Sequence, residues 1–114
     1  MITDKKVLRV LGRIKNTWVY DNVNSFPDDE RQGMSDMDIL KNEIDYVINR
    51  FDDYNGVIGR DLAEAKRILK ETKNGKYISF DINTFKPIYT DWEINDAKNL
   101  IAEYKQLKYY QKVL

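Results

Sequence analysis

The segment from Ser35 to Tyr54 carries the clearest periodic pattern in the chain and limits what the chain can fold into. Its apolar residues recur at alternating spacings of three and four: Met37, Leu40, Ile44, Val47 and Phe51. This period places them on one side of an α-helix. Ser35 can cap the helix, and Asp38 puts a carboxylate in the first turn, where the helix dipole favours negative charge. We therefore expect an amphipathic helix whose apolar side the rest of the chain must cover.

Other segments predict three more helices. A helix is expected over 3–22, capped by Thr3. Its apolar stripe consists of Val7, Leu11, Ile14 and Trp18, and its separate basic face consists of Lys6, Arg9 and Arg13. A helix over 60–72 has an Asn-Gly pair just beyond it, which is typical of a helix C-terminus. The last helix follows a T-x-x-E capping box at 90–93, and Asn95 is an alternative cap one turn later.

A β-hairpin is expected between the last two helices. Aromatic and β-branched residues alternate over 77–82, and a second such run covers 85–89 after a short polar connection. The sequence thus predicts a mainly α (α+β) fold, with four helices and one small β-hairpin between helices three and four. We expect a single domain over residues 1–114, because no linker or repeat divides the chain.

The composition argues against an enzyme. The chain contains neither cysteine nor histidine, which removes thiolate chemistry, the commonest general base and the commonest zinc ligands. Residues 51–62 partly match a calcium-binding EF-hand loop, but Phe51 and Leu62 occupy the first and twelfth positions, where carboxylates are needed. We expect no catalytic residue, cofactor or metal. Because no segment has the apolar length of a signal peptide or a membrane span, we expect a soluble, cytoplasmic protein.

The charged residues are segregated although they sum to zero. Residues 1–20 hold five basic residues and one acidic residue, 21–61 hold four basic and eleven acidic, and 62–114 hold ten basic and seven acidic. The balances are therefore +4, −7 and +3. Attraction between packed helices would explain this pattern, and so would an acidic middle segment that faces a basic partner.

The second explanation leads to our principal hypothesis for function. The polar face of the central helix combines carboxylates with a tyrosine, and tyrosine is enriched in protein interfaces. The candidate partner-binding residues are Asp38, Asp45, Tyr46, Asn49, Asp52 and Asp53. Such a face can imitate a phosphate backbone and bind a basic protein surface. Lys, Asn, Ile and Tyr are abundant, as in AT-rich genomes. We therefore expect a non-enzymatic protein-binding module, in concrete form a phage or mobile-element inhibitor of a host nucleic-acid enzyme, similar in class to anti-CRISPR proteins.

The order helix, turn, helix, hairpin from Ser35 to Tyr89 resembles winged-helix DNA-binding domains. This resemblance implies an alternative function as a DNA-binding regulator. The helix over 60–72 would then face the duplex and the hairpin would contact phosphates. The nucleic-acid-binding residues would be Arg60, Arg67, Lys70, Lys73 and Lys76, with Lys86 also on the hairpin.

Two further alternatives remain open at the level of sequence. The apolar stripe of the central helix could join two copies in a homo-oligomer. The basic faces of the first and last helices could contact phosphate groups or could simply be solvated. On the last helix that face carries Lys105, Lys108, Tyr109 and Lys112, where a ring could stack between cations.

Overall fold

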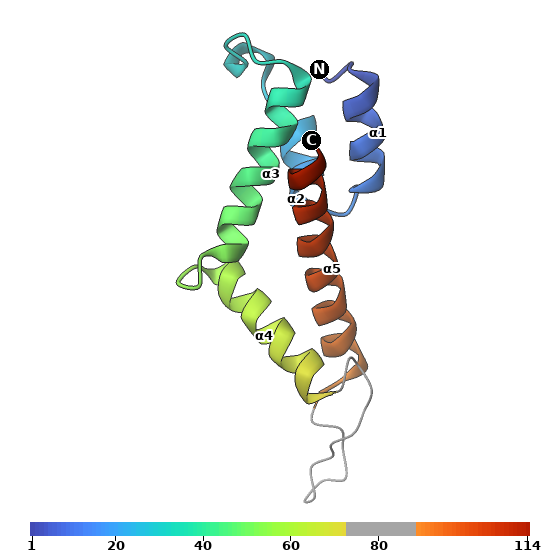
Figure 1. Ribbon diagram of the computed structural model, residues 1–114, viewed down its shortest axis with the longest axis vertical. Coiled ribbons are helices and arrows are strands. Elements are labelled where there is room, and N and C mark those ends of the chain that lie inside the picture. The colour runs from blue at the N-terminus through green and yellow to red at the C-terminus, as the bar shows by residue number, and fades with distance from the viewer. Residues whose placement is uncertain (73–88) are drawn as a thin grey trace, which may run out of the picture. The chain divides into compact units, whose positions relative to one another are not determined.

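A computed structural model describes residues 1–72 and 89–114 of the protein (Figure 1). In chain order these residues form α1 (Lys5–Arg13), α2 (Trp18–Asn24), a short 3-10 helix η1 (Asp28–Glu30), α3 (Asp36–Asp52), α4 (Val57–Glu71) and α5 (Asp91–Val113). Among the helices of these two ranges, none has the length and apolar character needed to cross a bilayer.

The predicted fold class is wrong. The described residues form five α-helices rather than four, and they contain no strand, so this part of the chain is all-helical rather than α+β. The expected hairpin covered 77–89, which apart from Tyr89 lies outside the described residues. Tyr89 itself packs against the apolar cluster of α4 and α5.

The additional helix arises because the expected helix over 3–22 is interrupted. Asp4, not Thr3, caps α1, since its carboxylate accepts the amides of Lys6 at 2.8 Å and Val7 at 3.3 Å. Helix α1 ends at Arg13, with Ile14 as its C-cap, and Thr17 starts the next helix. The Thr17 hydroxyl donates to the Ile14 carbonyl at 2.8 Å and accepts the Tyr20 amide at 3.3 Å. This local bonding replaces the helical ladder and makes Thr17 the cap of α2.

The described residues cluster into two compact units. Unit 1 comprises Met1–Asn49 and Gln106–Leu114, and unit 2 comprises Arg50–Lys105. Helices α3 and α5 each contribute residues to both units. The prediction of one domain over 1–114 stays a prediction.

Unit 1 has a core of aliphatic side chains from α1, α2, α3 and the end of α5. Val7, Ile14, Val19, Leu40, Ile44 and Leu107 are each at most 1% exposed. The expected burial of the α3 stripe is therefore confirmed for Leu40, Ile44, Val47 and Phe51, whereas Met37 at its start is only half-buried. Trp18, expected in the first stripe, is 45% exposed because the break at Thr17 shifts the phase of α2, which buries Val19 and Val23 instead.

A buried carboxylate joins the start of the chain to the start of α3 in unit 1. Asp36, only 9% exposed, accepts the amides of Thr3 and Asp4, both at 2.8 Å, and pairs with the Arg31 guanidinium at 2.7 Å. These bonds, above all that from the Asp4 amide, lower the pKa of Asp36 to about 2. The segment ahead of α1 is thereby tied to the start of α3.

Unit 2 packs α4 against the N-terminal part of α5. Its buried cluster consists of Ala65, Ile68, Ile94 and Ala97, flanked by Leu69, Tyr89, Leu100 and Ile101. The end of α3 belongs to the same unit, where the rings of Phe51 and Tyr104 meet edge to face at 5.4 Å. The Tyr104 hydroxyl donates to Asp52 at 2.7 Å, and the Lys66 ammonium lies 5.5 Å from the centre of the same ring.

Candidate functional site

The polar side of α3 in unit 1 presents the predicted carboxylate and tyrosine side chains to solvent. Asp38, Asp45, Tyr46 and Asn49 are all exposed, with Tyr46 at 52%. They share a continuous helix whose opposite side is buried, so the backbone beneath them is fixed by the core. This arrangement gives a rigid polar surface.

Asp38 has a structural role at the end of this surface. The Ser35 amide donates to its carboxylate at 3.2 Å, while the Asp38 amide donates to the Ser35 hydroxyl at 3.1 Å. These reciprocal bonds make a capping box, in which an acid at this position completes the helix N-terminus. Asp38 therefore adds negative charge to the surface but is committed to the helix cap.

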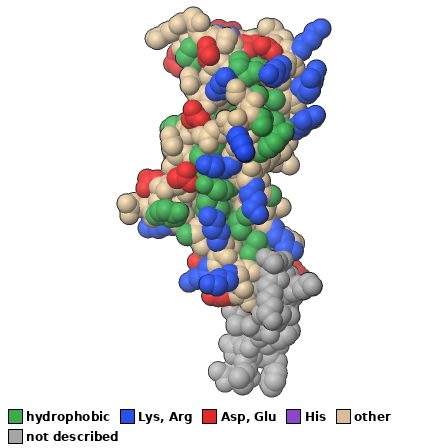
Figure 2. All heavy atoms as spheres, viewed as in Figure 1, with side chains coloured by type: hydrophobic (Ala, Val, Ile, Leu, Met, Phe, Trp, Pro, Cys, Tyr) green, Lys and Arg blue, Asp and Glu red, His purple; other side chains and the backbone are tan. Residues whose placement is uncertain are grey.

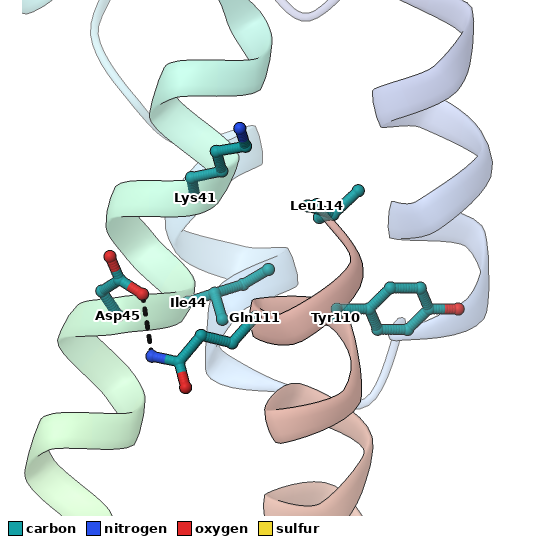
Figure 3. Close-up of a pocket in the computed structure, with 6 residues that line it drawn as sticks. All are labelled: Lys41, Ile44, Asp45, Tyr110, Gln111 and Leu114. Atoms are coloured by element: carbon teal, nitrogen blue, oxygen red, sulfur yellow. Dashed lines mark hydrogen bonds between the residues drawn. The ribbon is translucent and has the colours of Figure 1, made fainter.

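A pocket of about 190 Å³ adjoins the same surface (Figure 3). Residues of α3 and of the end of α5 line it: Lys41, Ile44, Asp45, Tyr110, Gln111 and Leu114. The Gln111 side-chain amide donates to Asp45 at 2.9 Å and holds that carboxylate in place. In Figure 3 the Lys41 side chain extends away from Asp45. The pocket thus combines an oriented carboxylate with the apolar side chains of Ile44 and Leu114.

The size of this pocket limits what it can accept. Pockets for cofactors and drug-sized ligands usually measure about 300–1,000 Å³. At about 190 Å³, the pocket is better suited to one inserted side chain than to a cofactor. The Asp45 carboxylate on its rim matches a cationic head on an apolar stem, while the Lys41 ammonium, which also lines the pocket, opposes such a ligand.

The other two predicted partner-binding residues belong to unit 2. Asp52 accepts the Tyr104 hydroxyl, and this bond raises the pKa of Tyr104 to about 12. The Asp53 carboxylate accepts the Asn55 amide at 3.0 Å, an arrangement typical of a turn. Both carboxylates are thus bonded within unit 2, and we restrict the candidate site to the residues of unit 1.

The residues of the alternative nucleic-acid surface are only partly described. Arg60, Arg67 and Lys70 are exposed on α4, at spacings of seven and three that keep them on one side of the helix. Arg67 is paired with Glu64 at 2.6 Å. Lys73, Lys76 and Lys86 lie outside the described residues.

Sequence patterns missed the α5 contribution to the candidate site. Gln111, Tyr110 and Leu114 come from more than 60 positions away along the chain, and the contact with Asp45 depends on how α5 packs. The near-total burial of Tyr110, which is 6% exposed, could not be inferred from its neighbours, since Tyr109 beside it is 59% exposed. In the described part of the chain, no group of three or more acidic side chains could hold a metal ion.

Comparison of the chain with protein-family models, with curated proteins and with solved structures finds no match to any of them.

Proposed function

We propose that unit 1 is a protein-binding module. Its α3 site, which we define as Lys41, Asp45, Tyr46, Asn49 and the pocket, would receive a basic segment of a partner protein. In this proposal one Lys or Arg side chain of the partner enters the pocket. Its methylene groups contact Ile44 and Leu114, and its charged head pairs with Asp45.

The carboxylate of Asp45 beside an apolar pocket is the observation on which this proposal depends. A carboxylate already oriented by Gln111 loses little side-chain freedom when it forms an ion pair. Tyr46, the next residue along α3, offers an exposed ring of the kind that dominates binding energy at interfaces. Charge, shape and an aromatic group therefore favour the same partner chemistry.

The concrete form that we propose is inhibition of an enzyme that acts on nucleic acid. Such enzymes turn Lys- and Arg-rich surfaces towards phosphate groups, and an acidic helix can occupy a surface of this kind. Binding of the inhibitor and binding of the nucleic acid would then exclude each other.

Photo-crosslinking tests the position of the interface. A photoreactive amino acid replaces Tyr46 in one variant and Asp61, an exposed residue of α4, in the control. In lysate of the organism that encodes the protein, the variant at position 46 should crosslink to a Lys- or Arg-rich segment of a partner, and the control should not. Equal crosslinking at both positions, or crosslinks at position 46 to an acidic segment only, would contradict the proposal.

Charge reversal on either side of the pocket tests the chemistry with that crosslinked partner. Asp45→Lys should weaken binding about tenfold, which corresponds to about 1.4 kcal/mol. Lys41→Glu should strengthen it about two- to fivefold, because the ammonium at the pocket repels a cationic side chain. Asp61→Lys is the matched control and should leave affinity unchanged. A weaker complex with Lys41→Glu would exclude a cationic ligand in the pocket.

A further inference from the structure

The outer side of α1 carries a row of cations, which we call the α1 basic stripe: Lys5, Lys6, Arg9 and Arg13. All four are exposed, whereas Val7, Val10 and Leu11 on the other side of the helix are buried. The view in Figure 2 shows Lys and Arg side chains along the edge of the molecule where α1 lies. The nine residues of α1 include no acidic side chain.

No ion pair among the described residues involves a cation of this stripe. The ion pairs found there within unit 1 use Arg31 or the amine of Met1 instead. Lys5, Arg9 and Arg13 follow one another at spacings of four, at which like charges on a helix repel by about 0.2–0.5 kcal/mol per pair. Lys5 and Lys6 also lie in the first turn, where the helix dipole disfavours positive charge. Apart from Arg13, which the dipole favours in the last turn, the stripe therefore works against the stability of its own helix, and an external anion would relieve the repulsion between its cations.

A glycine in the same row has no packing function. Gly12 is exposed, and a Cβ atom there would meet nothing within 4 Å. Gly12 is the penultimate residue of α1, and a glycine within a helix costs up to about 1 kcal/mol relative to alanine, so this position is another local weakness. Without a side chain, the helix surface beside Arg9 and Arg13 is flat enough for another backbone to approach closely.

We propose that the α1 basic stripe binds the phosphate backbone of a nucleic acid. From Lys5 to Arg13 the helix rises about 12 Å. Cations four residues apart are separated by about 6 Å along the helix. Neighbouring phosphates of one strand are separated by a comparable distance along that strand, so the row, with the reach of its long side chains, matches three to four phosphates. A regular row of cations thus meets a regular row of anions.

Other anionic ligands fit the stripe less well. A helix that lies on a membrane needs an exposed apolar face, but the apolar side of α1 is buried in unit 1 apart from Leu8. A specific protein interface needs aromatic or aliphatic anchors at its centre, and the centre of this stripe is Arg9 beside Gly12. The proposal is independent of the α3 site, because it uses a different helix of unit 1.

Salt-dependent DNA binding by matched variants of the full chain tests this proposal. One variant changes the stripe (Lys5→Gln, Lys6→Gln, Arg9→Gln and Arg13→Gln). The control removes the same charge from exposed lysines of α5 (Lys98→Gln, Lys105→Gln, Lys108→Gln and Lys112→Gln). Fluorescence polarisation with a short labelled DNA duplex, repeated with its single strand, measures affinity. Four phosphate contacts predict that raising salt from about 50 to about 200 mM weakens binding of the unchanged protein roughly 10²-fold.

The stripe variant should lose binding and most of the salt dependence, while the α5 control should retain both. Because glutamine removes the repulsion, the stripe variant should melt at the same temperature as the unchanged protein or higher, so that lost binding cannot be attributed to unfolding. Retained binding in the stripe variant would overturn the proposal, as would equal loss in both variants. Binding to phosphatidylserine vesicles without binding to either form of DNA would also overturn it.

Discussion

Gly59 and Gly12 both lie in helices, yet an added methyl group would meet different surroundings at the two positions. At Gly59 a Cβ atom would fall 1.9 Å from the carbonyl oxygen of Asp53, whereas at Gly12 it would meet nothing within 4 Å. We expect Gly59→Ala to destabilise the protein by about 1–3 kcal/mol, because a backbone atom cannot move aside as a side chain can. Gly12→Ala should stabilise it by about 0.5–1 kcal/mol. Urea unfolding followed by circular dichroism compares the stability of the two variants. A Gly59→Ala variant as stable as the unchanged protein would contradict the close approach of the Asp53 carbonyl oxygen to position 59.

Asp36 marks the limit of sequence analysis at the scale of single residues. Its neighbours Ser35 and Asp38 were assigned to the start of the helix, but the amides that Asp36 accepts belong to Thr3 and Asp4, more than 30 positions earlier. A long-range bond of this kind leaves no periodic trace in the sequence.

Because the pKa of Asp36 in the folded protein, about 2, lies below the ordinary value of 3.8, the stability that Asp36 contributes is present above pH 3.8 and lost as pH falls through about 2.

Individual helices were predictable to the extent that one apolar stripe continued through them. The α3 stripe keeps its period from Leu40 to Phe51, and both the helix and its burial are confirmed. The first stripe also kept its period through Trp18, so periodicity joined two helices that Thr17 separates. A buried hydroxyl that bonds backwards to a carbonyl competes with the helical ladder, and periodicity does not detect that competition.

The bond between Tyr104 and Asp52 connects the end of α3 to α5 within unit 2 and has a measurable consequence. Since a carboxylate that accepts the hydroxyl stabilises the neutral phenol, the pKa of Tyr104 is raised from 10.0 to about 12. The stability from this bond is therefore fully present below pH 10 and lost as pH rises through about 12. Asp52→Asn should return the Tyr104 pKa towards 10.0.

Carbon-13 NMR of labelled tyrosine, with Tyr104→Phe to assign the signal, follows this titration. Asp53→Asn is the matched control, because the Asp53 carboxylate accepts the Asn55 amide instead, and it should leave the Tyr104 pKa unchanged. Equal shifts in the two variants would mean that nearby negative charge, rather than the hydrogen bond, raises this pKa.

At the scale of the whole molecule, the charge segregation seen in the sequence has a structural counterpart in unit 1. The basic block at 1–20 supplies the α1 basic stripe, and the acidic block at 21–61 supplies the polar side of α3. Both helices contact the end of α5, where Gln106 donates to the Arg13 carbonyl at 3.0 Å and Gln111 to Asp45. Five residues turn a helix through about 500°, so these two glutamines face different sides of α5. The sequence predicted the two charge types but not the helix that separates them.

This separation predicts that the two proposed surfaces act independently. At physiological salt, charges more than about 8 Å apart are largely screened, and effects of distant substitutions usually add to within about 0.3–0.5 kcal/mol. We therefore expect Asp45→Lys to leave DNA affinity nearly unchanged and the four-residue stripe variant to leave partner affinity nearly unchanged. Combining both sets of substitutions should give the sum of the separate free-energy changes for each ligand. If the free-energy change of the combined variant differed from that sum by more than about 1 kcal/mol, both ligands would compete for one surface. Unit 1 would then present a single binding face, and the two proposals could not both be correct.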